Sequence, residues 1–138
     1  MKGKTIEEIR VGDAAAFSKT VSESDVYLFA GITGDLNPAH INEEEAAKSR
    51  FGGRIAHGML VSGFISTVLG MYLPGPGTIY LSQEVKFTAP VKIGDTVTAR
   101  AEVVELEPAK RKVTLRTTVT RQDGVVAVEG QAVVLAPK

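Results

Sequence analysis

The chain has 138 residues, of which 43% are hydrophobic and 23% charged, and this is typical of one globular domain spanning residues 1–138. Its 16 basic and 16 acidic residues balance, and no basic run argues for binding to nucleic acid or to an anionic membrane. The absence of cysteine excludes a disulfide framework, a thiolate metal site and a cysteine nucleophile. The opening MKGKTIEEIR lacks the apolar core of a signal peptide, so we expect a cytoplasmic protein.

The N-terminal region predicts a strand followed by a capped helix. Residues 14–21 favour a short strand. Ser22 and Asp25 then form a capping-box pattern, in which each side chain can bond the other residue's backbone N–H. The spacing predicts a helix from this cap to about Thr33.

Residues 34–40 predict an irregular loop, because Gly34 and Pro38 interrupt the helical pattern. Asn42, followed by Glu45, is typical of a second cap and predicts a short helix. Residues 51–54 (FGGR) indicate a flexible connection into the next segment.

Residues 57–73 (HGMLVSGFISTVLGMYL) carry no charged side chain and predict the central helix of the domain. Apolar residues fall on every side of the helical wheel, so we expect this helix to be buried all round. Small residues form a stripe that allows close approach of another backbone or a flat ligand: Gly58, Ser62, Ser66 and Gly70. A helix of this length covers roughly 25 Å, which is short for a membrane span.

The C-terminal half alternates apolar and polar residues with a period of two, which is typical of half-buried strands. Asp123-Gly124 is a strong hairpin turn, and the doubled Val103-Val104 indicates a bulge. We expect four consecutive hairpin-connected strands, built around 79–87, 97–106, 113–119 and 126–134. The expected class is α+β, with a curved antiparallel sheet wrapped around the long central helix.

Asp35 and His40 are the strongest candidates for chemistry, because a carboxylate and an imidazole on one constrained loop can divide acid–base work. The same residues also fit a structural role, since Asp and Asn before Pro are common turn residues and a lone His is often structural.

A second candidate is the start of the central helix, where the first backbone N–H groups have no intrahelical partners. Gly58 would let a thioester carbonyl reach them and so stabilise an oxyanion, or it could simply allow close packing. His57 could act as a base, cap the helix or pack. The two histidines and the scattered carboxylates show no metal-ligand spacing, so we expect no metal site.

The segment 29–40 (FAGITGDLNPAH), with Ala46 beyond it, resembles the signature of the MaoC-like (R)-specific enoyl-CoA hydratases, Gly-Asp-x-Asn-Pro-aliphatic-His. The resemblance extends to 54–59 (RIAHGM), 73–75 (LPG) and 93–95 (IGD), and covers most of the chain. Ala39 stands where the family usually has a larger aliphatic residue, which leaves the acid–base pair intact.

This resemblance implies a hot-dog fold, a homodimer whose sheets join edge to edge, and syn addition of water to a trans-2-enoyl-CoA without a cofactor. It implies that Asp35 and His40 activate the water, one as the base for attack at C3 and the other as the donor at C2, in an order left open. It implies that the Gly58 N–H is the oxyanion donor. Substrate contacts would come from Asn37, Ser66 and Leu69, with Leu69 limiting acyl length.

Two other functions fit the same fold, namely an acyl-CoA thioesterase and a non-catalytic acyl-CoA-binding module. A dehydratase of carrier-protein-bound acyl chains is a closer variant. The acyl length and the pathway stay open, and supply of polyhydroxyalkanoate monomers is among the pathways that fit. The CoA phosphates need surface cations, for which the candidates are Arg50, Arg54, Lys86 and Lys92.

Overall fold

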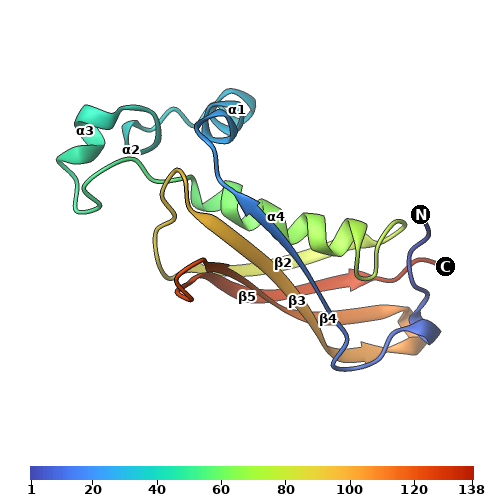
Figure 1. The fold of residues 1–138 in the computed structure, drawn as a ribbon. Coiled ribbons are helices and arrows are strands. Elements are labelled where there is room, and N and C mark those ends of the chain that lie inside the picture. The colour runs from blue at the N-terminus through green and yellow to red at the C-terminus, as the bar shows by residue number, and fades with distance from the viewer.

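A five-stranded antiparallel sheet curves along one long helix, α4 (Gly58–Met71), in the computed structural model, which describes residues 1–138 (Figure 1). The sheet order is β1-β3-β4-β5-β2. The strands are β1 (Ala14–Thr20), β2 (Ile79–Phe87), β3 (Thr96–Glu107), β4 (Lys112–Arg121) and β5 (Val126–Leu135). Short 3-10 turns, η1 (Ile6–Glu8) and η2 (Pro108–Lys110), complete the elements at the end of the molecule where the two termini lie. The α+β class and the sheet-around-helix arrangement expected from the sequence are confirmed.

The helix α4 packs its larger apolar side chains onto the concave face of the sheet. Val61, Ile65, Val68 and Leu69 are almost fully buried there, and such burial is worth about 1.5–3 kcal/mol for each side chain. The expectation that α4 would be buried all round is wrong for the single chain. Residues along its outer side are exposed, namely Met59, Gly63, Ser66 and Gly70.

The strand positions are predicted well, but their connections are not. β3, β4 and β5 do follow one another as antiparallel neighbours, and the bulge appears as a register shift between Val103 and Glu105. The Asp123-Gly124 turn joins β4 to β5, with Gly124 at a φ of +83°. However, β2 and β3 do not form a hairpin: β2 pairs with β5 at one edge, and β1 pairs with β3 at the other.

Between β1 and α4 the chain leaves the sheet and forms an excursion, residues 22–54, that lies beyond one end of the sheet (Figure 1). It contains α1 (Glu23–Thr33), α2 (Pro38–Ile41) and α3 (Glu43–Ala47). Both predicted caps are confirmed: Ser22 and Asp25 form a reciprocal capping box, and Asn42 accepts from the Glu45 N–H.

The segment 34–40 is more regular than expected, because α2 forms one helical turn within it. Pro38 stands at the first turn of α2, where its missing N–H costs nothing, and the Asn37 side chain caps the turn by accepting from the Ala39 N–H at 3.0 Å. Pro38 therefore begins a helix here instead of merely ending one.

Both ends of the excursion are fastened to the same short stretch, residues 91–95. The Val21 N–H donates to the Asp95 carbonyl at 2.8 Å, and the Ala56 N–H donates to the Val91 carbonyl at 2.7 Å. An isolated bridge pairs Ile55 with Lys92. None of the helices combines the length and the hydrophobicity that crossing a membrane requires.

Candidate active site

Asp35 lies directly after α1, where the chain turns sharply. Gly34 ends the helix at a φ of +80°, a left-handed conformation that glycine adopts without strain. The Asp35 N–H donates to the Thr33 hydroxyl at 3.2 Å, and the Asp35 carboxylate accepts from the Asn37 N–H at 3.2 Å. These local bonds fix the turn while the side chain stays exposed to solvent.

His40 projects from α2 and is held by the strand-like segment that leads into α4. Its Nδ1 lies 2.7 Å from the carbonyl oxygen of Ile55, and the Ile55 N–H donates to the Ala39 carbonyl at 3.1 Å. Because a carbonyl oxygen can only accept, Nδ1 carries the hydrogen in this contact. Nε2 is therefore the nitrogen left to exchange protons.

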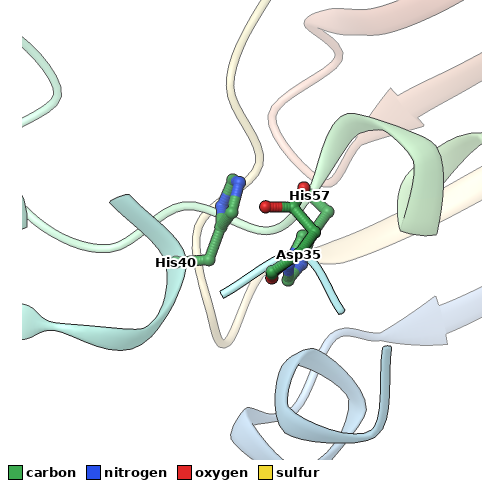
Figure 2. Close-up of side chains that lie close together, drawn as sticks. All are labelled: Asp35, His40 and His57. Carbon is green, nitrogen blue, oxygen red and sulfur yellow. The ribbon is translucent and has the colours of Figure 1, made fainter. Parts of the chain in front are cut away.

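His57, at the start of α4, completes a compact group of three side chains (Figure 2). One ligand-type atom from each of Asp35, His40 and His57 lies within 4.8 Å of the others. The rings of His40 and His57 stack with centroids 3.9 Å apart and an angle of 28° between their planes. The spatial meeting of Asp35 and His40 that the sequence suggested is therefore present.

The same three residues could in principle ligate a metal ion, but their geometry favours proton transfer. A carbonyl oxygen already faces one nitrogen of each ring, at 2.7 Å from His40 Nδ1 and 2.9 Å from His57 Nε2. The free lone pair of each imidazole lies in its ring plane. Two stacked rings therefore direct those lone pairs along nearly parallel planes instead of toward one shared ion.

A mostly apolar cavity of about 390 Å³ opens beside the group, lined by Asp35, His40 and His57 at one side and by Gly58 at the start of α4. Phe87, at the end of β2, lies so close to Gly58 that a Cβ there would be 2.7 Å from its ring. Glycine is therefore the residue that fits here without displacing the Phe87 ring. The remaining lining is largely apolar and comes from the segments 50–51, 55–56, 87–91 and 127–128 and from Met59 and Val61 of α4.

The three expected substrate contacts lie in different surroundings. Asn37 is on the exposed loop and caps α2. Ser66 lines a second hollow of about 400 Å³ between α4 and β2, outside the cavity that holds Asp35. Leu69 is 1% exposed and belongs to the hydrophobic core.

The four candidate cations differ in their freedom to meet an anion. Arg54 is already bound: it donates to Glu43 and Glu23, each at 2.9 Å, and to the Tyr27 hydroxyl at 3.0 Å. The carboxylates of Glu43 and Glu23 raise the pKa of the Arg54 guanidinium above its usual value. Arg54 thus links α1 to α3 through these bonds. The expectation that residues 51–54 form a flexible connection is therefore wrong for Arg54.

The other three cations are exposed, and of them Arg50 lines the main cavity. Its guanidinium carbon lies 4.9 Å from the centroid of the Phe51 ring. Arg50 is therefore the cation that the geometry favours for a phosphate at the cavity mouth. Lys86 and Lys92 lie on the exposed surface.

The sheet wrapped around α4, with an acid–base pair at the mouth of an apolar cavity, defines a hot-dog protein with the layout of an acyl-thioester enzyme. A model of the MaoC like domain matches residues 9–125. The chain is 57% identical to the (R)-specific enoyl-CoA hydratase of Rhodospirillum rubrum over 131 residues, covering 95% of this chain and 90% of that protein.

It is also 49% identical to the 3-hydroxybutyryl-CoA dehydratase of Methylorubrum extorquens, covering 96% of this chain and 83% of that protein. The solved structure of unliganded R-hydratase PhaJ1 from Pseudomonas aeruginosa superposes with a TM-score of 0.94 at 43% identity, covering 99% of this chain and 87% of that one. The chain belongs to the MaoC-like domain family, and the suspected relationship to (R)-specific enoyl-CoA hydratases is confirmed.

Sequence reasoning missed several residues of the site. His57 was left open between base, cap and packing, and its contact with the ring of His40 has no local signal. In the sequence Phe87 is one of the alternating apolar residues of the strand expected over 79–87, and nothing nearby marks it as part of the site. Its place against Gly58 depends on β2 lying at the sheet edge beside β5.

Proposed function

We propose that this protein adds water across the double bond of a trans-2-enoyl-CoA to give the (R)-3-hydroxyacyl-CoA, and catalyses the reverse dehydration. The observation that carries the proposal is the placement of Asp35 and His40 together at the mouth of an apolar cavity that also borders Gly58. The activities for which the relatives in R. rubrum and M. extorquens are named support it.

In this mechanism Asp35 and His40 hold one water molecule between them. His40 Nε2 takes a proton from the water as its oxygen bonds to C3, and the Asp35 carboxylate accepts a hydrogen bond from the second hydrogen. The electron pair of the C2=C3 bond moves onto the thioester oxygen. The His40 imidazolium then returns its proton to C2 on the same face, which gives syn addition.

The negative charge on the thioester oxygen needs a hydrogen-bond donor to stabilise it for as long as the enolate exists. The Gly58 N–H stands at the start of α4, where backbone N–H groups have no intrahelical partner and the helix dipole is positive. A preorganised donor of this kind is worth about 2.7–4 kcal/mol in the transition state. We assign this role to Gly58, with substrate contacts from the exposed Asn37 and Ser66, while the buried Leu69 would limit acyl length from within the core.

The first test follows purified protein with crotonyl-CoA by the ultraviolet absorbance of the conjugated thioester, with chiral analysis of the product. We expect the absorbance to fall, (R)-3-hydroxybutyryl-CoA to form and no free thiol to appear. Release of free thiol would show a thioesterase. Binding of crotonyl-CoA and longer enoyl-CoA esters without turnover would show a binding module, and turnover of carrier-protein esters alone would show a dehydratase of carrier-bound chains.

We also propose a homodimer joined along the edge strand β2. Apolar side chains of this edge are about half exposed in the single chain, namely Ile79, Leu81 and Phe87. The outer side of α4 lies next to them across the second hollow. Analytical ultracentrifugation should give twice the mass of 14.6 kDa, and Leu81→Lys should give monomers. The cytoplasmic location stays a prediction.

A further inference from the structure

His57 is buried yet has no role in the proton transfer described above. Its side chain is 2% exposed. Although it occupies the N-cap position of α4, it makes no capping hydrogen bond. Its Nδ1 is buried without any hydrogen-bond partner. A buried polar atom without a partner costs free energy, so a residue retained in such a place calls for an explanation.

The contacts of His57 all lead to the acid–base pair. Its Nε2 lies 2.9 Å from the backbone carbonyl oxygen of Asp35, and one face of its ring stacks on His40. Phe29 of α1 covers the ring as well, with centroids 4.8 Å apart. Figure 2 shows the three side chains together at the start of α4. The next residue in the chain is Gly58, at the other side of the cavity.

These contacts also settle the form of the imidazole. Nε2 must carry a hydrogen, because the carbonyl oxygen of Asp35 can only accept. A second hydrogen on Nδ1 would be buried without an acceptor and would add a charge directly beside His40. The neutral tautomer with the hydrogen on Nε2 avoids both costs. It also leaves room for positive charge on His40 during the reaction.

We infer that His57 is a positioning residue that ties the start of α4 to the backbone of Asp35 and supports the ring of His40. It thereby fixes the acid–base pair relative to the oxyanion donor, which is the next residue along the chain. This inference rests on the proposed function for its kinetic consequence. Its structural part, the tautomer and the bond to Asp35, stands independently of catalysis.

The kinetic test compares two variants that share a neutral side chain. His57→Phe keeps a flat ring but loses the donor to Asp35, and we expect kcat to fall about 10–100-fold with KM changed less than threefold. His57→Gln keeps an N–H donor and should recover kcat to within about fivefold of the unaltered protein. A misplacement of about 1 Å in a catalytic group costs on the order of 100-fold in rate, which sets this scale.

Val26→Ala is the matched control, because Val26 is fully buried in α1 and does not belong to the site. It should lower the melting temperature and leave kcat unchanged. If His57→Phe keeps full kcat, or if His57→Gln loses as much as His57→Phe, the inference is overturned.

A second measurement does not depend on activity. The chain has two histidines, so long-range proton–nitrogen NMR of His40→Gln reports on His57 alone. We expect neutral His57 with its hydrogen on Nε2. A hydrogen on Nδ1, or on both nitrogens, would overturn the inference. Failure of the proposed function would appear separately, as absence of turnover in the unaltered protein.

Discussion

The aromatic ring of Phe87 occupies the space that any side chain at position 58 would need, since a Cβ on Gly58 would lie 2.7 Å from the Phe87 ring. The end of β2 and the start of α4 are therefore in direct contact at the cavity. Both residues line the cavity, so the absence of a side chain at position 58 leaves the start of α4 without cover there.

Gly58→Ala should therefore reduce activity more than stability. The added methyl group must displace the Phe87 ring or shift the start of α4, and it also stands beside the proposed oxyanion donor, so we expect kcat to fall about 10²-fold or more, the scale for a lost donor. Steady-state kinetics with crotonyl-CoA measures the effect. Gly31→Ala in α1 is the control, because a Cβ there meets nothing within 4 Å. It should keep kcat and gain about 0.5–1 kcal/mol of stability.

Asp35→Asn and His40→Gln should each reduce kcat by about 10²–10⁴-fold, because the first removes the carboxylate that orients the water and the second removes the imidazole that moves its proton. Both side chains lie at the cavity mouth instead of in the core, so the melting temperature should change little. Circular dichroism and thermal melts check the fold. Near-normal turnover in either variant would contradict the mechanism.

Leu69→Ala should alter the preference for acyl length without abolishing activity, and Ser66→Ala should shift the preference in the same assay. Leu69 is buried in the core, so its truncation should also cost about 2–5 kcal/mol. Val68→Ala on the same helix is the control for lost stability alone. An unchanged profile from C4 to C12 substrates in both variants would remove Ser66 and Leu69 from the substrate site.

Arg50→Ala should raise KM for crotonyl-CoA about tenfold with little change in kcat, because Arg50 is exposed at the cavity mouth and would meet a phosphate. The effect should vanish with the N-acetylcysteamine thioester, which lacks the nucleotide, and should shrink at high salt. Lys110→Ala, in the exposed turn η2, is the charge-matched control. Equal effects on both substrates would mean that Arg50 acts on the acyl part.

Asp25 makes the stability of the fold depend on pH in the acidic range. Burial opposes ionisation of its carboxyl, but hydrogen bonds with Ser22 and the ammonium of Lys19 at 3.0 Å outweigh burial and hold the pKa of Asp25 below its usual value. In an unfolded chain this group titrates near pH 4. Its stabilisation is therefore complete above about pH 5 and is lost as the pH falls through the lower folded pKa.

Asp25→Asn should flatten the decline of melting temperature between about pH 5 and pH 2, since the side chain no longer titrates. Thermal melts across this range measure the difference. Glu105 is an exposed residue of β3, and Glu105→Gln should leave the decline of melting temperature below about pH 5 unchanged. A decline of the same steepness in Asp25→Asn would assign the acid response to other carboxylates.

The features that sequence predicts best are those that local chemistry decides. The capping box of Ser22 and Asp25 and the Asp123-Gly124 turn involve neighbouring residues, and both were found where expected. The pairing of β2 with β5 was not predictable in this way. Period two identifies a strand but not its neighbour, because β2 and β5 are far apart in the sequence.

The residues of the site likewise divide into those that a local pattern predicts and those that only the fold brings together. Asp35 and His40 belong to one loop, so their proximity was within reach of sequence reasoning. The stacking of His57 on His40 and the contact of Phe87 with Gly58 join distant parts of the chain and leave no local pattern. The exposed side of α4 is not predicted, because its residues (Met59, Gly63, Ser66 and Gly70) are uncharged and no polar face in the sequence marks them as exposed.

The excursion that carries Asp35 and His40 departs from and returns to one stretch of five residues, 91–95, through bonds at Val21 and Ala56. Because the excursion begins and ends at the same stretch of chain, its length or sequence can change without altering the register of the strands. The excursion, with Arg50 at the cavity, can then vary between relatives while the sheet and α4, which carries Ser66 and Leu69, stay the same. Residues 22–54 can therefore be exchanged as one unit between relatives, with Asp35 and His40 kept in place.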